Sequence, residues 1–434
     1  GVLRAGGVVV PMNVLLKRSE IAFYLEDSGA ELLLAWHGFA EEAREAAADA
    51  GAELVEVEPA AFAAALADLA SIGTDVADTD DDDTAVILYT SGTTGKPKGA
   101  VVTHANLHRN ADVSSRTTCG IAAGDVVFGG LPLFHSFGQT VSMNASLMVG
   151  ACLTLVPKFD PGEAMETMQR DRVTHFYGVP TMFGALLHHP GRESYDTSSL
   201  RTCITGGASM PVEVLRGFEE AFGAIVLEGY GLSETSPVAC SNHPDAERKP
   251  GSIGTPLEGV EMRVVDEDDN EVAQGEVGEI VIRGHNVMKG YWRRPDLTAV
   301  SRFDDRPDSY RTGDLAYQRD DAALMLVGRR DQQVKVRGHR IELLALEAAL
   351  NAHPSVHEAV AVATQDAAGG RLIAYMALRG DTADAPDLRD FVAARLAPYY
   401  MPDRFEWLRE LPRTANGKAD RSALRHRANQ SLMK

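Results

Sequence analysis

Residues 89–99 read Tyr-Thr-Ser-Gly-Thr-Thr-Gly-Lys-Pro-Lys-Gly, at the end of the apolar run Thr84–Tyr89. The run is typical of a buried strand. Glycine lets a backbone approach a ligand closely, and hydroxyl, ammonium and backbone N–H groups bind phosphate oxygens. The segment therefore predicts a polyphosphate-binding loop. Its predicted ligand-binding residues are Thr90, Ser91, Gly92, Thr93, Thr94, Gly95, Lys96 and Lys98.

The loop differs from a Walker A loop, which needs a glycine five residues before its Gly-Lys pair. Position 90 is Thr instead, and Pro97 follows Lys96. A flexible surface loop is the alternative interpretation. The concentration of glycine, hydroxyl and lysine residues in one short segment disfavours it.

Apolar runs alternate with helix-like stretches over the first 260 residues. This alternation is typical of an α/β fold with a largely parallel sheet. The runs that predict its strands are Cys152–Val156, His175–Tyr177, Thr202–Thr205 and Ile225–Leu227.

From about Val260 the pattern changes to short alternating strands, Met262–Val265 and Glu279–Ile282, which predict an antiparallel, barrel-like sheet. A stretch of α+β character follows Gly328. We therefore predict a large α/β domain over residues 1–328, with a β-rich subdomain at 260–328, and a small α+β domain over 329–434.

Composition limits the classes of function. The 434 residues include 42 Lys and Arg against 62 Asp and Glu, a net charge of −20 that argues against a nucleic-acid partner. Hydrophobic residues make up 44%, so the chain is not a disordered protein. Four widely spaced cysteines, none in a CxxC pair, suggest a reducing cytoplasm. No apolar stretch has the length of a transmembrane helix.

The glycine-rich loop resembles the phosphate loop of the adenylate-forming (ANL) superfamily, which includes acyl-CoA synthetases, luciferases and the adenylation domains of peptide synthetases. Further motifs similar to that superfamily's follow in its order. They are GVLRAGGVVVPMN (1–13), LPLFHSFG (131–138), TGGA (205–208), EGYGLSET (228–235), YRTGD (310–314), GRRDQQVKVRGHRIE (328–342) and PRTANGK (412–418). Family members usually carry a further N-terminal segment before the equivalent of Gly1.

The resemblance implies a two-step reaction. A carboxylate joins the α-phosphorus of ATP with release of pyrophosphate, and the acyl group then passes to a thiol. It also implies that residues 1–328 form the adenylation domain and that 329–434 form a mobile domain, which rotates about Asp331. Lys418 is then the catalytic lysine, which reaches between the carboxylate and the α-phosphate. Rotation would replace it with the stretch Lys335–Gly338.

Other motif residues acquire roles in the same way. Glu234 and Thr90 are expected to hold Mg²⁺, and His135 to lie at the acyl pocket as a further catalytic residue. Asp314 is expected to bind the ribose hydroxyls, and Tyr230 to stack on adenine. The remaining nucleotide-binding candidates are Gly206, Gly207, Ala208, Glu228, Gly229, Gly231, Ser233, Arg329 and Lys335.

The substrate acid is constrained by the segment Phe134–Phe137, which contains no carboxylate. A buried ammonium without a partner is costly, so an acid that lacks an α-amino group is favoured. Residues of the next predicted helix either line an apolar tunnel for an acyl chain or belong to the core. They are Met143, Ala145, Leu147 and Met148.

The resulting expectation is a medium- or long-chain fatty-acid–CoA ligase that uses ATP, Mg²⁺ and CoA. One alternative is a stand-alone enzyme that loads a carrier-protein phosphopantetheine, because the C-terminal motifs resemble those of peptide synthetases. The other is an inactive truncated nucleotide-binding module. A homodimer is left open. One departure from the family is the turn Asp321-Ala322-Ala323, which lacks the usual glycine.

Overall fold

The structure is a computed structural model that describes residues 1–68, 75–90, 97–330, 333–336, 339–364, 371–378, 387–414 and 419–432. Four groups of predictions concern residues outside these ranges: the loop 91–96, the hinge Asp331, positions 337 and 338 of the stretch Lys335–Gly338, and the catalytic Lys418. The side chain of Lys335 is likewise not described. Within the described ranges, the longest apolar helices are too short or too polar to cross a membrane.

The large domain is built on a seven-stranded sheet in the order β11-β10-β9-β8-β7-β5-β6. Five strands run parallel, and β10 and β11 are added antiparallel at one edge. The strands are β5 (Val126–Gly129), β6 (Cys152–Leu155), β7 (His175–Gly178), β8 (Thr202–Thr205), β9 (Ile225–Gly231), β10 (Val238–Ser241) and β11 (Thr255–Pro256). The predicted α/β class and the four predicted parallel strands are confirmed.

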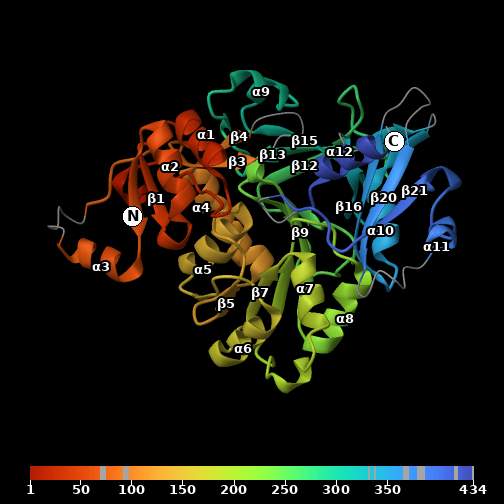
Figure 1. The fold of residues 1–434 in the computed structure, drawn as a ribbon, viewed down its shortest axis with the longest axis horizontal. Coiled ribbons are helices and arrows are strands. Elements are labelled where there is room, and N and C mark those ends of the chain that lie inside the picture. The colour runs from red at the N-terminus through yellow and green to blue at the C-terminus, as the bar shows by residue number, and fades with distance from the viewer. Residues whose placement is uncertain are drawn as a thin grey trace.

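Helices connect the parallel strands and bury their apolar sides against the sheet (Figure 1). They are α6 (Pro161–Asp171), α7 (Pro180–Leu187) and α8 (Val212–Phe222). Phe176 of β7 packs against Phe183 of α7 and Phe218 of α8 at the centre of this core. A crossover helix after each strand is the connection that a parallel sheet requires.

The strand that leads into the glycine-rich loop lies outside this parallel sheet. β3 (Thr84–Thr90) pairs antiparallel with β4 (Lys98–Thr103), and β4 pairs with β14 (Gly290–Tyr291). Only residues 91–97 separate β3 from β4, which is too short for a parallel crossover. The predicted loop therefore connects two strands of a hairpin.

The β-rich subdomain is a four-stranded antiparallel sheet, as predicted, in the order β12-β13-β15-β16. Its strands are β12 (Val260–Val265), β13 (Gly278–Gly284), β15 (Ser309–Gln318) and β16 (Leu324–Arg329), with α9 (Pro295–Val300) between β14 and β15. The structure thus places residues 310–314 and 328–329 on two paired strands.

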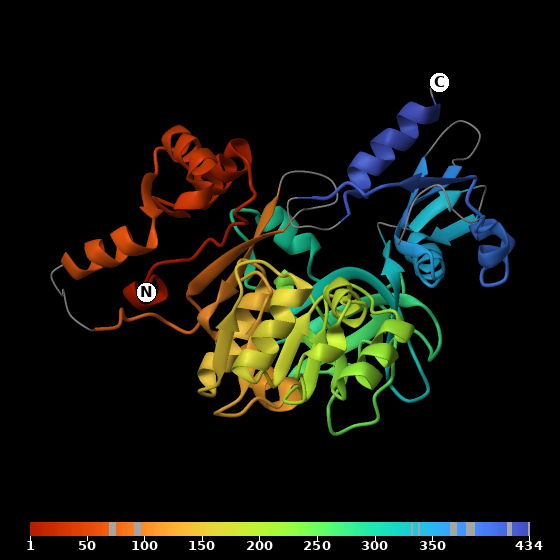
Figure 2. The same cartoon turned by 60° about the horizontal axis from the view of Figure 1, so that its bottom comes forward.

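The small domain has hydrophobic clusters of its own, which begin at Val336. Its elements are β17 (Gln333–Val336), β18 (His339–Glu342), α10 (Leu343–Asn351), β19 (Val356–Thr364), β20 (Arg371–Leu378), α11 (Arg389–Ala393), β21 (Arg404–Leu408) and α12 (Arg421–Leu432). This lobe lies at the opposite end of the molecule from the N-terminal helices (Figures 1 and 2). The exact boundary at 328/329 stays a prediction.

The N-terminal elements form a small unit with a core of its own around Ile21, Leu25 and Ala46. Val9 makes an isolated parallel bridge to Val86 and packs against the core of the large domain. The elements are α1 (Arg18–Ser28), β1 (Leu32–Trp36), α2 (Ala40–Ala50), β2 (Glu53–Val57) and α3 (Pro59–Asp68), followed after β4 by α4 (His104–Val113).

The turn without the usual glycine has a strained backbone. Ala322 has φ 64°, in the left-handed region that an L side chain rarely adopts. We predict that Ala322→Gly raises the free energy of unfolding by about 1 kcal/mol, because it relieves this strain. Urea denaturation measures the change. Ala299→Gly, in the exposed part of α9, is the matched control and should lower stability by about the same amount. A loss of stability in Ala322→Gly would contradict the prediction.

Candidate nucleotide-binding site

Two predicted nucleotide segments meet because β8 and β9 are neighbours in parallel register, with Thr205 opposite Glu228. The chain after β8 therefore lies beside the end of β9, at the carboxyl edge of the sheet, where α/β folds commonly bind ligands. A Cβ added at Gly206 would lie 3.4 Å from the carbonyl oxygen of Gly229 and from Cε1 of Phe137. The glycine therefore leaves room between these two groups.

Gly231 is required by the close approach of another backbone segment. A Cβ at this position would lie 1.8 Å from the carbonyl oxygen of Pro237, which is bonded to the amide of Leu232. Only glycine fits here, so this motif glycine has a structural reason to be present.

Asp314 lies on β15 opposite Arg329 of β16, and both were predicted to contact the nucleotide. Nη1 of Arg329 donates to Oδ1 of Asp314 at 3.0 Å, and the hydroxyl of Tyr230 donates to Oδ2. Burial and the adjacent Asp314 carboxylate raise the pKa of Tyr230. The structure therefore brings together three residues from three separate motifs.

Glu234 forms a second buried polar cluster, and its side chain is only 7% exposed. Its Oε1 accepts from the hydroxyl of Tyr291 at 2.9 Å and from Oγ1 of Thr90 at 3.3 Å. Nζ of Lys98 lies 3.9 Å away and donates to Tyr291 at 2.6 Å. Burial lowers the pKa of Lys98, although the Glu234 carboxylate opposes that shift.

The Glu234 cluster extends through Tyr291, whose hydroxyl lies 3.3 Å from that of Tyr310. Tyr310 is on β15, four residues before Asp314. Sequence reasoning missed Tyr291 altogether, since no motif spacing marks it. Tyr310 begins the YRTGD motif, so its place in that motif was the only available signal.

A magnesium ion is compatible with the Glu234 cluster. Mg²⁺ is usually bound by one or two carboxylates together with substrate phosphates and water. Glu234 and Thr90 offer oxygen atoms within one hydrogen-bond length of each other. Among the described residues, no group of three or more His, Cys, Asp or Glu gathers, so phosphates or water would have to complete the shell.

Other predicted site residues lie apart from these contacts. His135 is exposed, and its Nδ1 accepts from the amide of Phe137. Leu147 is 64% exposed and Met148 39% exposed, so neither lies in the core or lines a buried tunnel. Ser233 is half-buried at the start of a short 3₁₀ turn. The roles predicted for these residues remain predictions.

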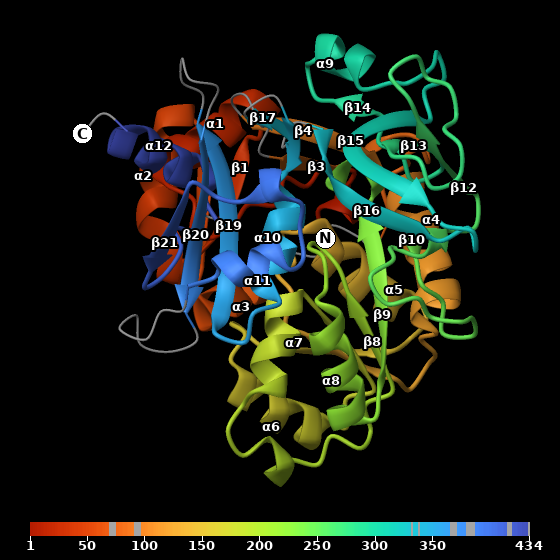
Figure 3. The same ribbon diagram turned by 90° about the vertical axis from the view of Figure 1, so that its right-hand side faces the viewer.

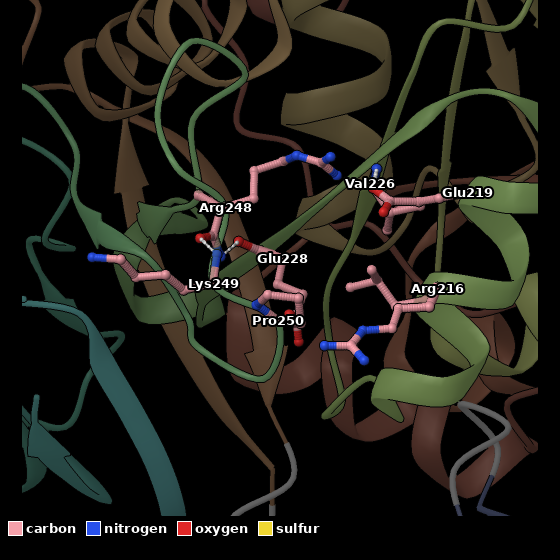
Figure 4. A pocket seen from close by; sticks show the side chains of 9 residues that line it. Arg216, Glu219, Val226, Glu228, Arg248, Lys249 and Pro250 are labelled. Carbon is pink, nitrogen blue, oxygen red and sulfur yellow. Dashed lines mark hydrogen bonds and ion pairs between the residues drawn. The ribbon is translucent and has the colours of Figure 1, made fainter.

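Glu228 lines a small cavity of about 100 Å³, together with residues of α8 and of the segment 248–250. Figure 4 shows Glu228 between α8, which carries Arg216 and Glu219, and the segment of Arg248 and Lys249. Its Oε2 accepts from the amide of Gly251 at 2.7 Å. Burial nevertheless raises the pKa of Glu228 to about 7.

This shift makes stability depend on pH. The folded protein keeps a proton on Glu228 up to about pH 7, whereas the unfolded chain releases it near pH 4.5, so stability falls as pH rises between these values. We predict that Glu228→Gln, which has no such proton to lose, gains stability relative to wild type over this window. Thermal melts at several pH values measure the difference.

The matched control is Glu220→Gln, on the exposed side of α8, which tests for the loss of a negative charge alone. A difference between Glu228→Gln and wild type that stays constant from pH 4.5 to 7 would contradict the prediction.

Comparison with known sequences assigns the chain to a family. Residues 1–292 match the pattern of the family described as AMP-binding enzyme, and 345–418 match AMP-binding enzyme C-terminal domain. A long-chain-fatty-acid–CoA ligase of Bacillus subtilis is 38% identical over 79% of this chain, although the match spans 61% of that relative. A sulfoacetate–CoA ligase of Cupriavidus necator is 34% identical over 99% of this chain and 84% of its own length.

Comparison with solved structures supports the same family. ATP-bound MatB from Rhodopseudomonas palustris gives a TM-score of 0.89 at 31% identity, with 99% of this chain and 85% of that chain covered. The apo form of MatB gives 0.76 at the same identity and coverage, so this structure superposes better on the ATP-bound form than on the apo form. The chain therefore belongs to the AMP-binding enzymes of the adenylate-forming superfamily, whose relatives here include acid–CoA ligases.

Proposed function

We propose that the protein activates a carboxylic acid with ATP, as an acyl-adenylate, and then transfers the acyl group to CoA. The observation that carries the proposal is a pair of buried carboxylates. Asp314 accepts from Tyr230, and Glu234 accepts from Tyr291, whose hydroxyl lies 3.3 Å from that of Tyr310 on the same strand as Asp314. One carboxylate suits a ribose and the other suits a metal-bound phosphate group. A nucleoside triphosphate needs both.

The nucleotide would be held at both ends. Asp314 accepts hydrogen bonds from the ribose hydroxyls, and the ring of Tyr230 supports adenine beside the space left by Gly206. Lys98 meets the phosphates at the end of the glycine-rich loop. Glu234 and Thr90 would hold Mg²⁺, which when bound neutralises phosphate charge and allows a second anion to approach.

The first step joins the two substrates. A carboxylate oxygen of the acid attacks the α-phosphorus, a P–O bond to pyrophosphate breaks, and the electron pair leaves with pyrophosphate. We propose that the positive charge of Lys418 stabilises the oxygens that become more negative in this step. The thiol of CoA then loses its proton to solvent and attacks the acyl carbon, the C–O bond to AMP breaks, and AMP leaves with the electron pair. For this step we propose a rotation about Asp331 that brings Lys335–Gly338 to the site.

The identity of the acid is a finer proposal. A fatty acid is supported by the Bacillus subtilis relative and by the lack of a carboxylate in 134–137 that would pair with an ammonium group. The exposed Leu147 and Met148 give it no support. Other relatives are named for sulfoacetate, ferulate and benzoate, and they cover nearly the whole of this chain at 32–34% identity.

The acceptor could instead be a carrier-protein phosphopantetheine. Tyrocidine synthase 3 is 34% identical over 98% of this chain, which spans 6% of that protein. We favour CoA because the acid–CoA ligases match over most of their own length. A cytoplasmic location, suggested by the cysteine pattern, is part of the same proposal.

The first test is acid-dependent release of pyrophosphate, measured with straight-chain fatty acids, aryl acids and amino acids in parallel. We expect release with one acid class that lacks an α-amino group. Lys418→Ala should reduce it by at least about a hundredfold, the scale of losing one charge-stabilising group in a transition state. Addition of CoA should convert the adenylate to a thioester.

Lys289→Ala is the matched control, since Lys289 is an exposed lysine whose Nζ contacts only the carbonyl of Asp82 in the described structure. No release with any acid, from a folded protein that binds ATP, would refute the ligase proposal. Loading of a carrier protein without use of CoA would refute the choice of acceptor.

A second test addresses the metal. Glu234→Gln keeps the shape of the side chain and its contact with Tyr291 but removes the charge. We predict at least about a tenfold lower rate of pyrophosphate release and a higher Mg²⁺ concentration at half-maximal rate. Glu267→Gln, in an exposed turn, is the control for charge. An unchanged Mg²⁺ dependence in Glu234→Gln would remove Glu234 from the metal site.

A further inference from the structure

Asp27, near the end of α1, lies between the N-terminal unit and the three-stranded sheet β14-β4-β3, and none of the sequence motifs includes it. Its Oδ2 accepts from the hydroxyl of Tyr89 at 2.5 Å. Its backbone carbonyl accepts from Nε1 of Trp292 at 2.9 Å and from Nη1 of Arg293 at 3.0 Å. Tyr89 belongs to β3, and Trp292 directly follows β14. Asp27 therefore contacts residues at both edges of this sheet.

An aromatic contact adds to the hydrogen bond. The ring of Tyr24, about one turn before Asp27 on α1, stacks on the ring of Tyr89, with centroids 4.3 Å apart and planes at 16°. Burial and the Asp27 carboxylate raise the pKa of Tyr89, so its hydroxyl keeps the proton that it donates. Stacking and a hydrogen bond to a charged acceptor together hold the Tyr89 side chain in one orientation.

The middle strand leaves room for this arrangement. Tyr89 lies opposite Gly99 of β4, whose carbonyl accepts from the amide of Trp292 at 2.7 Å. A Cβ at Gly99 would lie 2.6 Å from Cγ2 of Ile87 and 3.3 Å from Cζ of Tyr89. Glycine avoids this overlap, so Asp27 can reach both edges across a strand that has no side chain here. Figure 3 shows β3, β4 and β14 side by side beneath α9.

The opposite face of the same strands carries the Glu234 cluster. Successive residues of a strand point to opposite faces. Thr90 directly follows Tyr89, and Tyr291 directly precedes Trp292. Oγ1 of Thr90 and the hydroxyl of Tyr291 both donate to Glu234. One face of the sheet, the outer face, therefore lies against α1, and the other, the inner face, meets Glu234.

The middle strand follows the same alternation. Lys98 pairs with Thr90 and donates to Tyr291 on the inner face, and the next residue, Gly99, lies on the outer face. Hydrogen bonds weaken steeply when their atoms move apart, so a small displacement of either edge strand would disturb the contacts of the inner face. Contacts that hold both edges from the outer face oppose such a displacement.

We propose that Asp27 is a positioning residue for the metal and phosphate end of the nucleotide site. It holds β3 and the segment after β14 from the outer face, and so keeps their inner-face side chains within reach of Glu234. The inference rests on the proposed function, and it adds a residue from outside the motifs to that function. Asp27 itself does not need to touch ATP or Mg²⁺.

Calorimetric titration with Mg-ATP tests the proposal and requires no acid substrate. Asp27→Ala removes the acceptor, whereas Tyr89→Phe removes the donor and keeps the ring that stacks on Tyr24. We expect each variant to raise the Kd for Mg-ATP by about three- to tenfold, a range typical of residues that act on a ligand through their neighbours. The Mg²⁺ concentration at half-maximal pyrophosphate release should rise in the same variants.

A double variant separates the hydrogen bond from other effects. Both single changes remove the same bond, so Asp27→Ala combined with Tyr89→Phe should bind Mg-ATP about as weakly as one single variant. Asp27→Asn keeps an acceptor oxygen, so its Kd should lie closer to that of wild type than the Kd of Asp27→Ala does.

Two control variants match these changes. Glu26→Ala removes an exposed carboxylate from the same helix, and Tyr24→Phe removes a hydroxyl from the same aromatic stack. Both should bind Mg-ATP as wild type does. Thermal melts show whether each variant is folded at the assay temperature.

Two results would overturn the proposal: an unchanged Kd for Mg-ATP in folded Asp27→Ala or in folded Tyr89→Phe, or losses in the double variant that multiply. A lower melting temperature with an unchanged Kd belongs to the first of these results, since a purely structural contact would produce it. If wild type binds Mg-ATP but activates no acid, the proposed function fails, and the calorimetric comparison still decides the role of Asp27. If wild type activates an acid and Asp27→Ala binds Mg-ATP normally, only the inference about Asp27 fails.

Discussion

The cost of burying negative charge governs the site. Glu234, Asp314 and Glu279 are each at most 7% exposed on their side chains, and a buried carboxylate is tolerated only with donors or cations around it. Each has them: Tyr291 and Lys98 for Glu234, Tyr230 and Arg329 for Asp314, and Arg311, Arg330 and the Gly313 amide for Glu279. The donors come from distant segments, so these bonds tie the hairpin, the parallel sheet and the antiparallel sheet together.

The three sheets contribute different parts of the proposed nucleotide site. The hairpin β3–β4 presents the glycine-rich loop, and the parallel sheet presents the ends of β8 and β9. The antiparallel sheet presents Asp314 and Arg329 from paired strands. The small domain has a separate hydrophobic core.

Much of the fold and part of the candidate site were predictable from local sequence. Apolar runs with helix-like stretches between them predicted the parallel sheet, because burial on both faces demands such runs. The motifs predicted that Tyr230, Asp314 and Arg329 act together, and the structure joins them. The antiparallel pairing of β3 was harder to predict, since a buried apolar strand has the same sequence pattern in parallel and antiparallel sheets. Leu147 and Met148 were also ambiguous, because apolarity alone does not say which way a helix faces.

The sequence by itself determined the family, the order of the motifs and the kinds of chemical groups available, because these depend on residue type and spacing along the chain. Only the tertiary structure decided which distant groups meet: Tyr291 at Glu234, Tyr310 beside Tyr291, and Glu279 between Gly313 and Arg330. The physical reason is that a hydrogen bond acts over about 3 Å, whereas these partners lie from 19 to 57 residues apart in the chain. The register of paired strands brings these distant residues together, and no local sequence pattern specifies that register.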